Sequence, residues 1–216
     1  MKLYSKRNSV FLIGSGPSER VEKHFRLASD WEWELAVYRQ LSGHLPVPKL
    51  LASGENVLIL EYLPFPTLLD VLESQERTGF RSEPWEAFAQ WVRQCHDDCG
   101  MVCGDGNLRN FLWDELESRC VGLDFEGYRR GELPEAGANL VAYLTEYDPA
   151  DSPVKRQAAS ILRSELGVSD SSIHAIRQEL RLRRSIKAAG ANGTSAQRGA
   201  GLRRMSITGD FGKVSE

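Results

Sequence analysis

The sequence predicts an α+β fold in which a small antiparallel sheet at the N-terminal end precedes a mostly helical part. Three observations support this prediction. Short apolar runs separated by turn residues, which are typical of strands, occur within residues 1–63. Longer segments with helical periodicity follow from residue 84 onward. A second hairpin, over residues 111–123, interrupts those helices beside a group of acidic and amide side chains.

The first strands of the sheet are predicted over residues 9–13 and 20–25, which are joined by a glycine-containing turn. In the second strand, Val21, Lys23 and Phe25 lie on the same face, because side chains alternate along a strand. Lys23 therefore lies between two apolar neighbours. We expect its side chain to point inward.

A helix is predicted directly after these strands. Ser29 with Glu32 three positions later matches a capping box, and the helical pattern continues to about Leu41. Glu34 and Tyr38 share one face of this helix with Leu41, because residues three and four apart lie above one another. Glu34 is therefore expected to face inward, toward Lys23.

The apolar run at residues 57–60 is predicted to be a buried strand, which Pro64 and Pro66 prevent from continuing. This stretch closes the sheet and leads into the second part of the chain. A helix is then predicted from Pro84 to His96. Its buried stripe consists of large apolar side chains at helical spacing: Trp85, Phe88, Ala89, Val92 and Cys95.

Residues 103–110, with the sequence Cys-Gly-Asp-Gly-Asn-Leu-Arg-Asn, are the most informative stretch of the chain. Asp105 and Asn110 lie five residues apart within it. A second acidic residue, Asp124, follows a short apolar strand in the sequence Leu-Asp-Phe-Glu-Gly. The apolar runs on either side of a polar turn predict a hairpin that brings Asn110 and Asp124 to the same end.

These three side chains suit phosphoryl transfer. Catalysis of that reaction is mostly positioning and neutralisation of phosphate charge by Mg²⁺. Asp105 would accept or orient the proton of an attacking hydroxyl. Asn110 and Asp124 would ligate Mg²⁺, because hard oxygen donors suit this ion. A turn-forming role is the alternative for any one Asp or Asn, but three in this order favour the catalytic interpretation.

Residues 96–127 resemble the catalytic and metal-binding loops of the protein-kinase-like superfamily. The small atypical members are most similar: aminoglycoside phosphotransferases, RIO kinases, lipopolysaccharide-sugar kinases and the kinase subunit of the KEOPS complex. In those families a helix ending in Leu-His leads, through a Gly and an apolar pair, to His-Gly-Asp with Asn five positions on. This chain has Cys95-His96, Gly100-Met101-Val102, then Cys103-Gly104-Asp105 and Asn110. It departs at Cys103, which replaces the His, and at Glu126, which interrupts Asp-Phe-Gly.

The resemblance implies a two-lobed protein-kinase-like fold. Its N-lobe is expected to span residues 1–63 and to contain the small antiparallel sheet. A reduced, mostly helical C-lobe with the catalytic loop would span residues 64–187, and residues 188–216 would form a flexible basic tail.

The resemblance also implies an ATP site. Lys23 paired with Glu34 would hold the phosphates, and the backbone from Glu61 to Leu63 would contact adenine. The expected cofactors are therefore ATP and Mg²⁺. The phosphate-covering turn would lie near residues 6–8 and contains no glycine, because the glycines at 14 and 16 directly precede the Lys23 strand and form a hairpin turn.

The C-terminal end of the chain is predicted to be helical and then basic. Helices are expected over residues 136–147, 154–166 and 172–187, the last opened by Asp170 or Ser171. From residue 177 onward, nine Lys and Arg against three Asp and Glu give a net charge of +6, which leaves −9 for the rest of the −3 total. A nucleic-acid partner is the less favoured interpretation, since aromatic residues are not interleaved with these charges.

Composition places few limits on this interpretation. The chain has 216 residues, 41% hydrophobic and 26% charged, which is ordinary for a globular protein. No apolar run approaches the ~20 residues of a membrane helix, and the N-terminus lacks a signal-peptide core. We therefore expect no membrane span and a cytoplasmic location. Cys95, Cys99 and Cys103 lie at every fourth position, and reduced thiols are favoured over a metal site because no second ligand pair is present.

The predicted function is a kinase-like phosphotransferase that moves the γ-phosphate of ATP to a hydroxyl of a small molecule or glycoconjugate sugar. The glycine-free turn leaves a pseudokinase or regulatory nucleotide-binding module as one alternative. The basic tail leaves an ATPase or kinase component of an RNA-modification complex as another.

Overall fold

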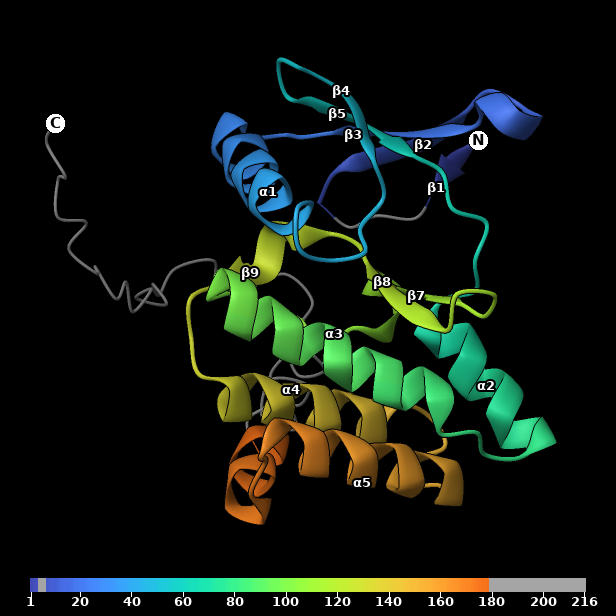
Figure 1. The fold of residues 1–216 in the computed structure, drawn as a ribbon, viewed down its shortest axis with the longest axis vertical. Coiled ribbons are helices and arrows are strands. Elements are labelled where there is room, and N and C mark those ends of the chain that lie inside the picture. The colour runs from blue at the N-terminus through green and yellow to red at the C-terminus, as the bar shows by residue number, and fades with distance from the viewer. Residues whose placement is uncertain (4–6, 179–216) are drawn as a thin grey trace, which may run out of the picture. The chain divides into compact units, whose positions relative to one another are not determined.

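The structure is a computed structural model, which describes residues 1–3 and 7–178. At its N-terminal end five strands form one antiparallel sheet in the order β1-β2-β3-β5-β4. The strands are β1 (Lys2–Leu3), β2 (Ser9–Ile13), β3 (Arg20–His24), β4 (Leu50–Gly54) and β5 (Val57–Glu61). Helix α1 (Ala28–Leu41) connects β3 to β4 and lies against this sheet (Figure 1).

β3 is an inner strand, paired with β2 on one side and β5 on the other. The predicted inward direction of Lys23 is confirmed, since this residue is 6% exposed. In β5, Leu58 and Leu60 are buried, whereas Val57 and Ile59 are partly exposed. The predicted burial of this run is therefore confirmed for Leu58 and Leu60 and wrong for Val57 and Ile59, because α1 covers one face of the sheet (Figure 1).

α1 begins one residue before Ser29, and no side chain caps its N-terminus. The predicted capping box of Ser29 and Glu32 is wrong, because both residues lie inside the helix instead of at its start. The predicted inward face is confirmed. Glu34 is 1% exposed, and Tyr38 and Leu41 are buried beside it.

Helix α2 (Leu68–Thr78) is an element that the sequence pattern did not predict. Its N-terminus carries a complete capping box. Thr67 Oγ1 accepts a hydrogen bond from Asp70 N (3.2 Å), and Asp70 Oδ2 accepts one from Thr67 N (2.8 Å). The Thr-x-x-Asp pattern directly after Pro66 is the signal that marks this helix in the sequence.

Helices α3 (Glu83–Cys99), α4 (Leu133–Glu146) and α5 (Pro153–Leu166) stack below the sheet in the view of Figure 1. These three helices were predicted, and their ends differ from the expected ones by a few residues. The predicted stripe of α3 is buried throughout.

The chain is helical again at residues 170–178. Ser169 Oγ accepts a hydrogen bond from Ser172 N (3.2 Å), so Ser169 provides the cap and the predicted Asp170 and Ser171 do not. The remainder of the predicted helix to residue 187, and the basic tail after it, lie outside the described residues.

Two short pairs of strands lie between the sheet and the stacked helices. β7 (Phe111–Asp114) and β8 (Arg119–Gly122) form the predicted hairpin, with Phe111 opposite Gly122. β6 (Val102–Cys103) pairs with β9 (Tyr128–Arg129). Both pairings place the segment that begins at Asp124 next to the segment that begins at Gly104.

One hydrophobic core connects the sheet side to the helical side. Its central aromatic rings follow one another from α1 to α3. Tyr38 contacts Phe125 edge-on at 5.2 Å, Phe125 contacts Tyr128 at 5.1 Å, and Tyr128 contacts Trp91 at 6.2 Å between ring centroids. The position of α1 is therefore set by packing against the segment after β8 as well as against the sheet.

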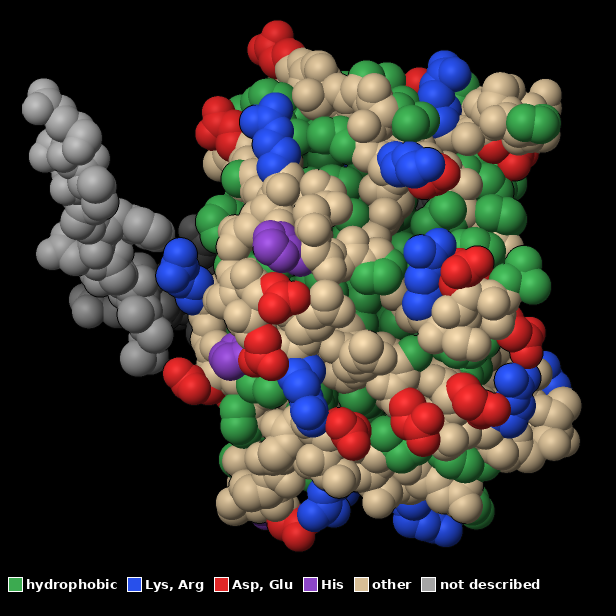
Figure 2. Space-filling view, viewed as in Figure 1, with side chains coloured by type: hydrophobic (Ala, Val, Ile, Leu, Met, Phe, Trp, Pro, Cys, Tyr) green, Lys and Arg blue, Asp and Glu red, His purple; other side chains and the backbone are tan. Residues whose placement is uncertain are grey.

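Residues Met1–Gln178 form one compact unit. The predicted boundary between lobes at residue 63 falls in the segment that links β5 to α2, and it stays a prediction. No helix among the described residues is long and apolar enough to cross a membrane. On the face shown in Figure 2, Lys and Arg side chains are interspersed with Asp and Glu over the helices.

Replacing Thr67 with Ala should lower the free energy of unfolding by about 1 kcal/mol, because it removes the side-chain half of the α2 capping box. Ser29→Ala is the matched control, since Ser29 makes no capping bond in α1. That variant should stay within about 0.5 kcal/mol of the parent. Urea unfolding of both variants measures the difference, and equal losses would contradict the assignment of the caps.

Candidate active site

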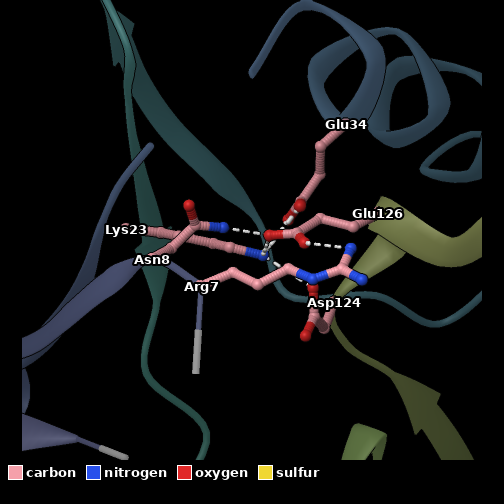
Figure 3. Close-up of polar contacts among 6 residues, drawn as sticks. All are labelled: Arg7, Asn8, Lys23, Glu34, Asp124 and Glu126. Carbon is pink, nitrogen blue, oxygen red and sulfur yellow. Dashed lines mark hydrogen bonds and ion pairs between the residues drawn. The ribbon is translucent and has the colours of Figure 1, made fainter. Parts of the chain in front are cut away.

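Lys23 lies at the centre of the candidate site. Its Nζ donates hydrogen bonds to Glu34 Oε2 (2.7 Å) and Oε1 (2.9 Å), and to Asp124 Oδ1 (2.7 Å). Figure 3 shows these groups converging from β3, from α1 and from the segment after β8. The structure therefore brings Lys23 and Glu34 together as the sequence predicted. It also joins them to Asp124, 101 residues further along the chain than Lys23.

Glu126 is a site residue that sequence reasoning treated as an interruption of a motif. Its Oε1 lies 3.3 Å from Lys23 Nζ, and its side chain is 14% exposed. Asn8 Nδ2 also donates a hydrogen bond to Glu126 Oε1, and Arg7 Nη1 lies 3.8 Å from its Oε2. The sequence signal for this role was the acidic residue at position 126, which interrupts the motif Asp-Phe-Gly.

The carboxylates of Glu34, Asp124 and Glu126 share the one buried ammonium of Lys23. Their oxygen atoms lie within 4.8 Å of one another. Burial alone would lower the pKa of Lys23, but Glu34 and Asp124 raise it above its ordinary value. Burial raises the pKa of Glu34 to about 7; Lys23 opposes that shift and Asp124 adds to it. Burial is thus the main cause of the raised pKa of Glu34, whereas neighbouring carboxylates cause the raised pKa of Lys23.

Asp105 lies in a loop whose ends are held by backbone contacts. Gly104 N donates a hydrogen bond to Gly127 O (3.0 Å), which ties the loop of residues 104–110 to the segment after Asp124. A Cβ on Gly104 would lie 2.4 Å from Gly127 O, and one on Gly106 would lie 2.8 Å from the Tyr143 ring. Glycine on both sides of Asp105 is therefore required by close packing.

The thiol of Cys103 holds the backbone of Asp105. Cys103 Sγ donates a hydrogen bond to Asp105 O (2.9 Å), and Cys103 is buried. The Asp105 carboxylate itself is exposed, and its Oδ1 accepts a hydrogen bond from Asn107 N (3.2 Å). Cysteine at this position therefore orders the loop and leaves the carboxylate accessible.

The four cysteines of the chain are free and buried. Burial raises the pKa of Cys103 to about 12 and also raises the pKa values of Cys95 and Cys120. They are protonated at neutral pH, whereas a metal ligand must be a thiolate. The thiols at residues 95–103 are free, as expected, and the preference against a metal site there stays a prediction.

Asn110 and Asp124 lie at the same end of the β7–β8 hairpin. Leu123 N, directly before Asp124, donates a hydrogen bond to Asn110 O (2.7 Å). Asp124 has a left-handed backbone with φ of 54°, a conformation that costs of order 1–3 kcal/mol outside glycine. In this conformation the Asp124 carboxylate accepts a hydrogen bond from Lys23 of β3. This bond holds the turn after β8 in place.

The predicted adenine-contacting stretch lies at the end of β5. Glu61 N donates a hydrogen bond to Lys49 O (2.9 Å), so this amide is already engaged within the sheet. Leu63 lies just past the strand, in the segment that leads to α2. A backbone donor for adenine would therefore come from Tyr62 or Leu63, and the role of the stretch stays a prediction.

The donors at the site suit Mg²⁺, the ion that the sequence resemblance implies. Asn110 and Asp124 offer the amide and carboxylate oxygens that Mg²⁺ prefers. The surplus of carboxylates over ammonium groups leaves negative charge beside them. A divalent cation would balance that charge.

No known protein-family profile matches the sequence, and no curated protein matches it significantly. Solved structures do match. The structure of WaaP in complex with acyl carrier protein aligns with a TM-score of 0.56 at 16% identity, over 89% of this chain and 88% of that one. WbdD with the kinase inhibitor LY294002 aligns with a TM-score of 0.52 at 16% identity, over 77% of this chain and 45% of that one. These likenesses show that the chain has the protein-kinase-like fold.

The pKa of Glu34 predicts a pH-dependent stability. A carboxyl with a pKa of about 7 when folded, against an ordinary pKa of 4.5, binds more protons in the folded state between those values. Its contribution to the free energy of unfolding is therefore largest below about pH 4.5 and is lost as pH rises through about 7.

Urea unfolding of the parent and of Glu34→Gln, from pH 4.5 to 7.5, isolates this contribution. The parent should lose stability relative to the variant as pH rises, by a few kcal/mol at most, since one pKa unit corresponds to about 1.4 kcal/mol. A parent that gains stability relative to the variant over this window would show that Glu34 is ionised with a lowered pKa.

Proposed function

We propose that this chain transfers the γ-phosphate of ATP, with Mg²⁺, to a hydroxyl of a small molecule or of a sugar in a glycoconjugate. The observation that supports this most strongly is the Lys23 ammonium held between Glu34 and Asp124. Such an arrangement keeps a cation next to a metal-binding carboxylate, where a nucleotide phosphate needs both. The protein-kinase-like fold agrees with this proposal.

Asp105 is the proposed base. Because Asn107 N holds Asp105 Oδ1, the other carboxylate oxygen is available to accept the proton of the acceptor hydroxyl. The tie between Gly104 and Gly127 keeps this carboxylate beside the segment that carries Asp124. The base and the phosphate-holding groups are thereby positioned by the same backbone contacts.

Asn110 and Asp124 are the proposed Mg²⁺ ligands. When bound, the ion would neutralise charge on the phosphates. Lys23 would hold the phosphates from the sheet side, with Glu34 fixing the direction of its ammonium. The adenine would contact the backbone between Glu61 and Leu63.

A cavity of about 210 Å³ supports a small, hydroxyl-bearing acceptor. It is lined by residues of α2, the catalytic loop, the loop after α4 and α5: Leu69, Leu72, Glu73, Glu76, Arg109, Tyr147, Asp148 and Lys155. The acidic side chains of this lining can accept hydrogen bonds from sugar hydroxyls, and the basic side chains can donate them. The two leucines offer an apolar surface for a sugar ring. The volume is below the roughly 300–1,000 Å³ of sites for drug-sized ligands, so a single ring suits it.

The cavity is connected to the base by hydrogen bonds. Tyr147 Oη lies 3.1 Å from Asn107 Oδ1 and accepts a hydrogen bond from Leu108 N (3.2 Å). Arg109 belongs to the same loop as Asp105. A ring bound in this cavity would therefore lie along the catalytic loop.

A regulatory nucleotide-binding module is a second candidate function. The turn between β1 and β2 has no glycine, whereas phosphate-cradling loops generally use glycine. Such a module would bind nucleotide without turning it over. The RNA-modification alternative rests on the tail, which lies outside the described residues.

Asp105→Asn should abolish phosphotransfer while leaving nucleotide binding intact, because the amide cannot accept the proton. A loss of about 100-fold or more is expected for a general base. Asp124→Asn should remove both turnover and the Mg²⁺-dependent part of nucleotide binding, and Asn tolerates the left-handed backbone of this position.

ATP turnover with and without Mg²⁺ measures both effects. The matched control is Asp98→Asn, an exposed aspartate at the end of α3. Turnover that survives both site substitutions would contradict the assigned roles. Nucleotide binding by the parent without turnover would favour the regulatory module.

Arg109→Ala should raise KM for an acceptor sugar about tenfold, as expected for loss of a hydrogen bond from a charged group. KM for ATP should not change, because Arg109 lines the cavity on the catalytic-loop side. A panel of hexoses, heptoses and their methyl glycosides supplies the acceptors. Arg93→Ala, which breaks an exposed pair with Glu165, is the control. Equal changes in the acceptor KM of the two variants would show that the cavity is not the acceptor site.

A further inference from the structure

Three nitrogen-bearing side chains converge on the carboxylate of Glu126. Asn8 donates a hydrogen bond to it, Lys23 Nζ lies 3.3 Å from Oε1, and Arg7 Nη1 lies 3.8 Å from Oε2. In Figure 3, Arg7 and Asn8 reach Glu126 from the chain before β2, and Lys23 reaches it from β3. The three donors therefore surround one anionic group.

These donors are of the kinds that bind phosphate. Arginine, lysine and amide side chains donate to phosphate oxygens as they donate to a carboxylate. Lys23 is also the residue proposed above to hold the nucleotide phosphates. Arg7 and Asn8 directly precede β2, at the position where the sequence predicts the phosphate-covering turn.

Arg7 and Asn8 supply side chains, whereas glycine-rich loops supply backbone amides. Residues 4–8 are Tyr, Ser, Lys, Arg and Asn, without a glycine. Asn8 is 5% exposed and is held against Glu126, whereas the Arg7 side chain is 79% exposed. An exposed ion pair contributes little, so Arg7 can exchange its carboxylate for a more highly charged anion.

We propose that Arg7 and Asn8, with Lys23, form a side-chain phosphate site, and that Glu126 occupies it as an internal substitute for the nucleotide phosphate. The inference rests on the proposed function and extends it to residues of the first turn. Nucleotide phosphate displaces Glu126 from these donors. Glu126 thus keeps the donors assembled before the nucleotide binds and competes with it.

Two substitutions distinguish the donors from the competitor. Arg7→Ala should weaken binding of ATP and of inorganic tripolyphosphate about tenfold, the change expected for one charge-assisted hydrogen bond. It should leave adenosine binding unchanged. Glu126→Gln keeps an acceptor for Asn8 but removes the negative charge. It should tighten tripolyphosphate binding severalfold without Mg²⁺.

Calorimetric titration of ATP, tripolyphosphate and adenosine into the full chain measures these affinities. Arg81→Ala is the matched control, because it removes an exposed arginine that pairs with Glu115 on the helical side. The expected result is a phosphate-specific loss in Arg7→Ala that Arg81→Ala does not share.

The outcomes separate the inference from the proposed function. Equal ATP affinities of the parent and of Arg7→Ala would overturn the inference and leave the proposed function standing. Weaker ATP binding by Glu126→Gln in Mg²⁺, with no gain for tripolyphosphate without it, would make Glu126 a metal ligand and also overturn the inference. A parent that binds neither ATP nor tripolyphosphate would overturn both.

Discussion

The buried ammonium of Lys23 is the constraint on which the rest of the site depends. A charge removed from water must be paired, because an unpaired buried charge costs several kcal/mol. Glu34 and Asp124 provide that pairing from two different parts of the chain. On the same face of α1, Tyr38 packs against Phe125, the residue after Asp124. An ion pair and an aromatic contact therefore hold the same helix against the same loop.

This arrangement fits the role in phosphotransfer that we propose for the acidic residues. The cluster has more carboxylates than cations, and burial raises the pKa of Glu34 within it. A bound metal–nucleotide complex would place its metal ion beside Asp124 and its phosphate oxygens beside Lys23. The catalytic loop shares the geometry, because Gly104 is bonded to Gly127 and the thiol of Cys103 fixes the backbone of Asp105.

Local patterns predicted those parts of the site that depend on periodicity. Lys23 was placed inward by its apolar neighbours in β3, and Glu34 by its spacing from other buried residues in α1. Short motifs did not predict the helix caps correctly, because the position of a residue relative to the helix end decides whether it caps. Ser29 is a residue type that often caps helices but lies inside α1, whereas Thr67 caps α2, a helix that the sequence pattern did not predict. The contacts of Glu126 with the first turn join residues 118 apart, and no local pattern encodes such a pairing.

Diffraction from crystals grown with Mn²⁺ and a non-hydrolysable ATP analogue tests the central claim most directly, because Mn²⁺ gives an anomalous signal. The account predicts a metal peak between the side-chain oxygens of Asn110 and Asp124, with a phosphate oxygen on Lys23 and the adenine beside residues 61–63. A metal peak elsewhere, or a nucleotide whose phosphates do not reach Lys23, would contradict it.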